Sequence, residues 1–208
     1  MSLYLQIVIN LTLCTGLILF IIAGIKIRLA VMLFFSGELA LELTDLVGRL
    51  MKLNTLNTYN YALSQFLSLI MLTEIYRKYC IRIPDVARGM IYLYAGALLM
   101  GNMIYMQSNT SVTFYSNIIS SIIICSFAAA YFMKIIRRGR AEKSLFVINI
   151  LVFLFFSVEC LISTTFSFLI SNHLDWVAPV WLFRGVLLLS FYIAFINLGW
   201  CVGKIRVR

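Results

Sequence analysis

The sequence predicts an all-α protein, a polytopic membrane bundle of seven transmembrane helices that forms one domain over residues 1–208. Three observations lead to this fold class. The composition is that of a membrane protein, seven apolar segments are each long enough to cross a bilayer, and the basic residues gather on one side of the segments.

The composition excludes a soluble globule. Of the 208 residues, 62% are hydrophobic and 12% are charged, and the mean hydropathy is +0.99. Soluble domains carry about 45–50% apolar and about 25% charged residues, so this chain lacks the polar residues to cover a surface in water. The same hydrophobicity excludes intrinsic disorder. The five cysteines form no CxxC pair and fit no disulfide framework, and a single histidine allows no histidine pair for haem, so we expect no cofactor and no metal.

Seven segments have the length that a membrane helix needs. About 20 apolar residues span a hydrocarbon core of roughly 30 Å. The segments are residues 5–25, 29–50, 59–79, 86–106, 113–135, 144–170 and 177–202. Every connection between them is short, which leaves no room for a soluble domain.

Each segment ends where polar or basic residues begin. In chain order these residues are Lys26 and Arg28, then Arg49 and Lys52, then Arg77, Lys78, Arg82, Pro84 and Arg88, then 107–112, then Lys134, Arg137, Arg138, Arg140 and Lys143, then 172–176, and finally Lys204, Arg206 and Arg208. One side holds 14 of the 17 Lys and Arg residues, whereas the opposite side holds only Arg49 and Lys52. The positive-inside rule then places the N-terminus outside and the C-terminus in the cytoplasm. The expected location of the protein is the cell (inner or plasma) membrane.

The net charge of +9 is therefore a topology signal. We expect Arg137, Arg138 and Arg140 to form a cytoplasmic turn that faces lipid headgroups or a protein partner. Nucleic acid is not expected as a partner.

Ionisable residues inside membrane segments are costly and point to function, and the second segment contains four. Glu38, Glu42, Asp45 and Arg49 follow one another at steps of four, three and four residues. At 100° per residue they fall within a stripe about 60° wide on one helix face. That face is expected to look into the bundle or into a wet cavity.

Two charged residues of other segments reach the same depth. A rise of about 1.5 Å per residue puts Glu38 roughly 13 Å and Glu42 roughly 19 Å from the cytoplasmic end. The same rise puts Glu159 about 21 Å and Arg184 about 20 Å from that end. Four carboxyls thus face one deep arginine and the shallower Arg49. At least one acid is expected to be neutral at pH 7, or neutralised by a bound cation or cationic ligand.

The candidate site for a ligand or a proton comprises Glu38, Glu42, Asp45, Gln65, Glu159 and Arg184. Gln65 shares one face of the third segment with Tyr61 and Ser68, where these side chains either line the same space or bond a neighbouring helix. A buried acid–arginine pair can also fix helix register without any ligand. The excess of acids favours a binding site.

Glu74 stays outside this site. It lies within one turn of Arg77 and Lys78 near the inner end of the third segment. We expect an ion pair at i,i+3 or i,i+4 there.

Two segments share a short pattern that ends in glutamate. Residues 33–38 read LFFSGE and residues 154–159 read LFFSVE. Both segments start on the cytoplasmic side, so the pattern suits a 3+1+3 plan of two parallel repeats joined by the fourth segment. Chance is the alternative, because Leu, Phe and Ser are common in membranes. In span number and direction alone, the chain resembles heptahelical receptors, rhodopsins and small sugar transporters of the SWEET type.

Three functions follow from these patterns. In the first, a receptor or sensor binds a small ligand or proton at the acidic cluster, and helix movement reaches a separate cytoplasmic or membrane partner, because the short loops hold no output domain. In the second, a small proton- or cation-coupled transporter or channel uses the same carboxylates. In the third, a non-catalytic accessory or scaffold subunit uses the acids for assembly. No GxSxG, HExxH or Walker A motif occurs, so we do not expect an enzyme. Gly96 and Gly101 allow close helix approach, inside the bundle or in a homo-oligomer.

Overall fold

The computed structural model describes residues 3–22, 29–51, 54–105, 110–139 and 142–205. These residues form seven α-helices and contain no strand. The helices are α1 (Leu3–Ile22), α2 (Leu29–Leu50), α3 (Asn54–Ile75), α4 (Asp85–Tyr105), α5 (Thr110–Arg138), α6 (Lys143–Asn172) and α7 (Leu174–Ile205), and a π-helical turn, η1 (Tyr76–Cys80), continues α3. The all-helical prediction is confirmed, with each helix at its expected place in the chain.

Four of the helices are long and apolar enough to cross a membrane. The candidate spans among the described residues are Tyr4–Ile21 in α1, Tyr115–Arg138 in α5, Lys143–Thr165 in α6 and Asp175–Asn197 in α7. The other three helices have 21 or 22 residues, and α2 carries four charged residues. The crossing of α2, α3 and α4 stays a prediction.

The distribution of side chains is that of a protein in lipid. Large apolar side chains are exposed on the outside, for example Leu93 on α4, which is 77% exposed, and Ile136 on α5, which is 74% exposed. Polar side chains such as Gln6, Asn102 and Asn149 are buried inside. Lipid accepts the apolar exterior, and polar groups must find partners within the bundle. Together with the four apolar helices, this pattern indicates a membrane protein.

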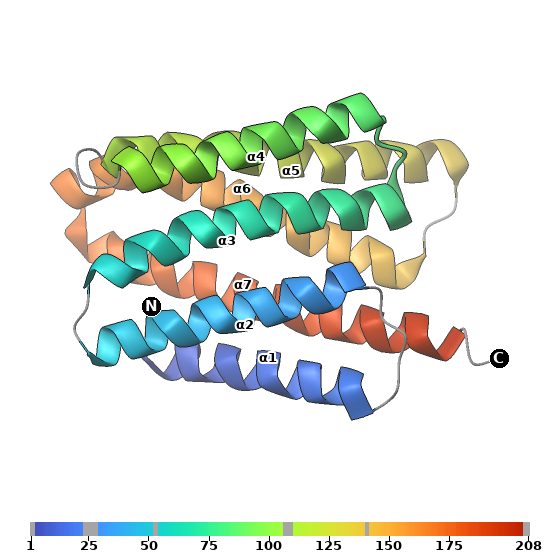
Figure 1. Cartoon of the computed structure of the whole chain (residues 1–208), viewed down its shortest axis with the longest axis horizontal. Coiled ribbons are helices and arrows are strands. Elements are labelled where there is room, and N and C mark those ends of the chain that lie inside the picture. Colours follow the sequence, from blue (N-terminus) through green and yellow to red (C-terminus); the bar gives the residue numbers. More distant parts are fainter. Residues whose placement is uncertain (1–2, 23–28, 52–53, 106–109, 140–141, 206–208) are drawn as a thin grey trace.

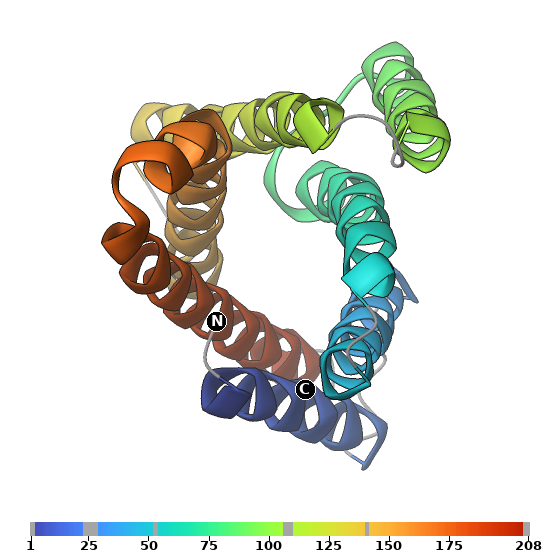
Figure 2. The same cartoon turned by 90° about the vertical axis from the view of Figure 1, so that its left-hand side faces the viewer.

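The helices lie side by side along the longest axis of the molecule (Figure 1). Seen along that axis, six of them form a closed ring in the order α1, α2, α3, α5, α6 and α7, and α7 packs against α1 (Figure 2). Helix α4 lies outside the ring, mainly against α3 (Figure 2). The ring encloses the space in which the candidate site lies.

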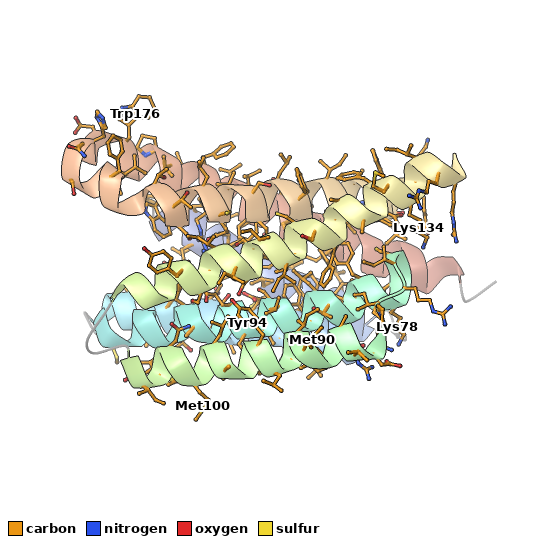
Figure 3. The ribbon with its side chains drawn as sticks, turned by 90° about the horizontal axis from the view of Figure 1, so that it is seen from above. Lys78, Met90, Tyr94, Met100, Lys134 and Trp176 are labelled. Carbon is orange, nitrogen blue, oxygen red and sulfur yellow. The ribbon has the colours of Figure 1, made fainter. Side chains whose placement is uncertain are left out.

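The two ends of the bundle differ in charge. Lys78 and Lys134 lie at one end, which we call the basic end, and Trp176 lies at the opposite end (Figure 3). Arg137 and Arg138 are exposed at the basic end, where α5 stops. Arg140, expected beside them, lies outside the described residues. The cytoplasmic location of the basic end stays a prediction.

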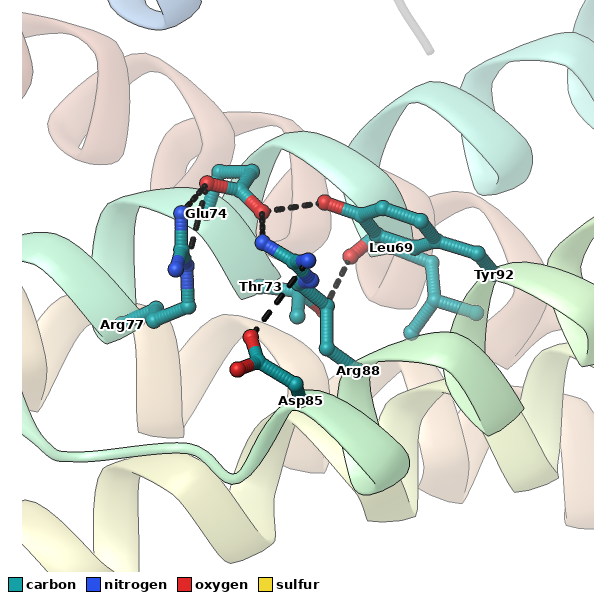
Figure 4. Close-up of polar contacts among 7 residues, drawn as sticks. All are labelled: Leu69, Thr73, Glu74, Arg77, Asp85, Arg88 and Tyr92. Atoms are coloured by element: carbon teal, nitrogen blue, oxygen red, sulfur yellow. Dashed lines mark hydrogen bonds and ion pairs between the residues drawn. The ribbon is translucent and has the colours of Figure 1, made fainter.

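An ionic network fastens α4 to the outside of the ring (Figure 4). Arg77 donates to Glu74 at 3.0 Å, which confirms the predicted i,i+3 pair. Tyr92 of α4 donates its hydroxyl to the same carboxylate. Arg88 lies 3.9 Å from Glu74 and 3.4 Å from Asp85. These groups are at the basic end, whereas the rest of α4 packs mainly against α3 and bonds α5 through Asn102.

Candidate functional site

A cavity of about 70 Å³ lies near the middle of the ring, among α2, α3, α5, α6 and α7. We call it the acidic chamber. Its lining includes Glu38, Glu42, Tyr61, Ser64, Gln65, Ser68, Asn117, Ser120, Glu159, Arg184 and Tyr192, with apolar residues such as Phe34, Phe155 and Phe191. Five of the six predicted site residues therefore line one cavity, although they come from four helices.

Glu38 of α2 is 4% exposed and is held by hydroxyl groups from two other helices. Ser68 donates to its carboxylate at 3.2 Å, and Ser64, one turn earlier on α3, lies 3.4 Å from both carboxylate oxygens. Tyr192 of α7 donates to the same group at 3.0 Å. The side chain thus links α2, α3 and α7 through neutral donors.

Glu159 of α6 is also 4% exposed, and it forms an ion pair with Arg184 of α7. Asn117 of α5 donates to the second carboxylate oxygen of Glu159 at 3.2 Å and lies 2.6 Å from the hydroxyl of Ser163. An ion pair taken out of water needs such additional hydrogen bonds to offset its desolvation. The sequence put these two residues at one depth without pairing them, and the structure brings them into contact between α6 and α7.

The guanidinium of Arg184 also lies against aromatic rings. Its central carbon is 5.1 Å from the centre of the Trp181 ring and 5.7 Å from that of Phe155. Such contacts favour a cation over the face of a ring. Trp181 is consequently placed to report on the charge state of the chamber.

The described lining holds three carboxyls, those of Glu38, Glu42 and Glu159, and one guanidinium. Arg49 was the second arginine in the charge balance expected from the sequence, but its side chain lies outside the described part of the structure. An excess of carboxyls over guanidinium groups therefore remains at the chamber itself.

Gln65 combines the two roles that the sequence left open. It lines the chamber together with Tyr61 and Ser68. It also accepts a hydrogen bond from Ser116 of α5 at 3.1 Å, and so joins α3 to α5. The predicted common face of these three residues is thus the face that meets the chamber.

Asp45 is the predicted site residue that lies apart from the chamber. It is not among the lining residues, and its carboxylate accepts a hydrogen bond of 2.6 Å from Gln6 of α1. Asp45 stands about 10 Å further along α2 than Glu38. At that height the same helix face meets α1, so a shared face did not imply a shared cavity.

Sequence reasoning missed three partners of the acids: Ser64, Asn117 and Tyr192. Ser64 is one turn from Ser68, and Asn117 is an isolated amide in an apolar helix. Polar side chains inside a membrane helix usually bond across helices, so their depth was the signal available. Tyr192 gave no such signal, because tyrosine is also common in apolar cores.

Aromatic side chains close the chamber toward the basic end. Relative to the chamber acids, Phe34, Phe35, Phe155, Phe191 and Phe195 are nearer that end on their helices, and each is at least 94% buried. The rings of Phe155 and Phe191 stack with centres 5.9 Å apart, and those of Phe191 and Phe195 are 4.7 Å apart. We call these five residues the aromatic layer. It separates the chamber acids from the basic end with apolar material.

No family model, no curated protein and no solved structure matches this chain.

Proposed function

We propose that this protein is a non-enzymatic membrane sensor, which binds a proton or a small cation in the acidic chamber and passes the resulting helix movement to a separate protein partner at the basic end. In this proposal all seven helices cross the cell (inner or plasma) membrane, with the N-terminus outside. The observation that carries it is the chamber itself, in which three carboxyls and one guanidinium line one small cavity.

The size of the chamber supports a proton or a small cation over an organic ligand. Pockets for drug-sized molecules measure about 300–1,000 Å³, whereas the chamber measures about 70 Å³. A water molecule needs about 10–15 Å³ of such space. The chamber therefore suits a few water molecules, or one small cation with part of its hydration shell.

The contacts of Glu38 supply a way to couple binding to helix position. As a carboxylate, Glu38 accepts from Ser64, Ser68 and Tyr192. A protonated carboxyl donates one hydrogen bond itself, so one of these contacts has to be rearranged. Tyr192 lies on α7, which continues through the aromatic layer to the basic end. Arg137 and Arg138, exposed at that end, offer a positive surface to an acidic partner or to anionic lipid.

Closure of the chamber toward one end suits a sensor, but one state of an alternating-access transporter has the same closure, so proton flux is the measurement that separates the two. The aromatic layer lies between the chamber acids and the basic end. A transporter has to open its site to both sides in turn. A sensor needs access from one side only.

A proton- or cation-coupled transporter is the second candidate, and the shared LFFSxE pattern favours it. Glu38 and Glu159 hold the same place in the two copies of the pattern, and both line the chamber. The ring order also agrees with a 3+1+3 plan. If α1, α2 and α3 correspond to α5, α6 and α7, each repeat forms one half of the ring, and α4 lies outside it. Transporters are often built from such repeats.

The test is a pH titration of Trp181 fluorescence in lipid nanodiscs, with Trp176 and Trp200 replaced by Phe. We expect a sigmoidal change between about pH 4 and pH 9, because the ring lies against Arg184 and next to the charges of the chamber. Glu38→Gln and Glu159→Gln should remove the transition or move its midpoint by about one pH unit or more. Glu142→Gln, an exposed glutamate at the start of α6, is the control and should leave the curve unchanged.

The same variants in pyranine-loaded liposomes separate the two candidates. A titration without proton flux supports the sensor. Flux that disappears in Glu38→Gln supports the transporter and overturns the sensor. If Trp181 fluorescence changes neither with pH nor with added Na⁺ or K⁺, both candidates are overturned. The acids are then left with a role in assembly.

A further inference from the structure

Buried polar atoms without a well-formed hydrogen bond gather where α3, α4 and α5 meet. Among the described residues, Asn102 Oδ1 on α4 and Ser121 Oγ on α5 have no hydrogen-bond partner. Tyr94 of α4 and Ser120 of α5 interact only with each other, outside good hydrogen-bond geometry, and Gln65 Nε2 of α3 likewise interacts only with Tyr61. Asn102, Ser120 and Ser121 are at least 97% buried. Buried polar groups in folded proteins are almost always hydrogen-bonded to protein or to ordered water, so this group needs an explanation.

A chain of hydrogen bonds runs through the same place. Asn102 of α4 donates to Ser116 of α5 at 3.3 Å, and Ser116 donates to Gln65 of α3 at 3.1 Å. Each of the three helices contributes one residue. At one end of this chain Oδ1 of Asn102 has no partner, and at the other end the amide of Gln65 also interacts with Tyr61.

The helices pack loosely here. Helices α3 and α5 pack less extensively than any other neighbouring pair in the ring, and α4 covers this pair from outside (Figure 2). Figure 3 shows Tyr94 on the side of α4 that faces the bundle, and Met100 on the outer side. Lipid cannot satisfy the polar atoms beneath α4, so water is the available partner.

The polar residues between α3, α4 and α5, which we call the seam (Gln65, Tyr94, Asn102, Ser116, Ser120 and Ser121), extend from the chamber toward one end of the molecule. Gln65 and Ser120 line the chamber and also belong to the seam. Asn102 is about 5 Å from the end of α4, and Ser116 is about 9 Å from the start of α5, by the helical rise. Both of these helix ends lie opposite the basic end.

We propose that the α3–α4–α5 seam is a water-filled route, through which protons or small cations reach the acidic chamber from the end opposite the basic end. Gln65, Asn102, Ser116 and Ser120 hold the water along this route. That protons or small cations move along this route rests on the proposed function, whereas the presence of water in it does not. The aromatic layer on the other side makes this the entrance of the chamber.

Cysteine accessibility tests the route. In the full chain with its five natural cysteines replaced by serine, single cysteines are introduced by Asn102→Cys, Ser116→Cys and Ser120→Cys. A membrane-impermeant methanethiosulfonate reacts with thiolates, which form only in contact with water. The matched controls are Met100→Cys and Ile104→Cys, which flank Asn102 on α4 but are 62% and 68% exposed on the apolar outside.

We expect Asn102→Cys and Ser116→Cys to react at least about tenfold faster than the two controls, and Ser120→Cys to react more slowly than these because it is deeper. Equal rates at Asn102, Ser116 and the controls would show a dry seam and overturn the route. The replacement of serine by cysteine is nearly isosteric, so the two serine positions decide the matter if Asn102→Cys does not fold.

The outcome is independent of the Trp181 titration. Fast labelling with a flat titration keeps the water route and rejects the proposed function. A titration without labelling keeps the proposed function and rejects this route.

Discussion

At the scale of single residues, the chamber holds two glutamates in contrasting surroundings. Glu159 is compensated by the guanidinium of Arg184 and by the amide of Asn117. Glu38 is surrounded by the hydroxyl groups of serine and tyrosine side chains. A hydroxyl can donate to a carboxylate or accept from a carboxylic acid. Within the proposed function the proton therefore binds at Glu38, whereas Arg184 forms the ion pair with Glu159.

The Glu159–Arg184 pair can be tested by a double-mutant cycle. Arg184→Gln should lower the free energy of unfolding by about 3–5 kcal/mol, because it leaves a buried carboxylate without its cation. The double variant Glu159→Gln/Arg184→Gln should lose less than the sum of the two single variants. The free energies are measured by denaturant unfolding in micelles.

Ser190→Ala serves as the control for this cycle. Ser190 lies on the same helix and bonds only its own backbone, at Val186, so little change is expected. Additive losses in the double variant would contradict a direct coupling between the two charges.

At the scale of the helices, one glycine sets how closely α2 and α3 approach. A Cβ atom on Gly37 would lie 2.5 Å from the nearest methyl of Leu67. Leu67 precedes Ser68, and Gly37 precedes Glu38, so the close approach brings the serine hydroxyls to the carboxylate. On α4, by contrast, a Cβ on Gly96 meets no described atom within 4 Å. The glycines of α4 thus face away from the described bundle, and a homo-oligomer through that face stays a prediction.

Enlarging Gly37 should therefore disturb the site. Gly37→Leu is expected to lower the free energy of unfolding by about 1–3 kcal/mol through overpacking, and to alter the Trp181 titration as α3 moves away from Glu38. Gly37→Ala should have a smaller effect, because the tip of Leu67 is able to move. Denaturant unfolding and the fluorescence titration measure both variants.

Gly96→Leu is the matched control, and it should change neither measurement. If Gly37→Leu behaves like Gly96→Leu, the close approach of α2 and α3 has no part in forming the site.

At the scale of the whole molecule, the bundle is a ring of six helices with a seventh outside. Polar residues face the inside of this ring and large apolar residues face outward. Four helices have the composition of membrane spans. The other three run beside them over similar lengths (Figure 1), so seven crossings are the simplest arrangement in a bilayer.

Reporter fusions test the number of crossings. Reporters that are active only outside the cytoplasm, placed after each helix in turn, should alternate between the two sides, with those after α1, α3, α5 and α7 inside. The informative positions are those after α2, α3 and α4. Reporters on a single side at these three positions would show that only the four apolar helices cross.

The sequence alone determined the helices, their order and the residues available to the site. Hydrophobic length and helical periodicity are local properties, so they located the helices and put Glu38, Glu42, Glu159 and Arg184 at similar depths. The rise per residue gave the common depth of Glu159 and Arg184, but not that these two residues form the ion pair.

Only the tertiary structure decided which helices are neighbours. It excluded α4 from the ring, directed Asp45 to α1, brought Tyr192 and Asn117 to the two glutamates, and limited the chamber to about 70 Å³. The physical reason is that periodicity fixes the face and the height of a side chain on its own helix. What that face meets depends on the packing of the other helices, which are distant in the sequence.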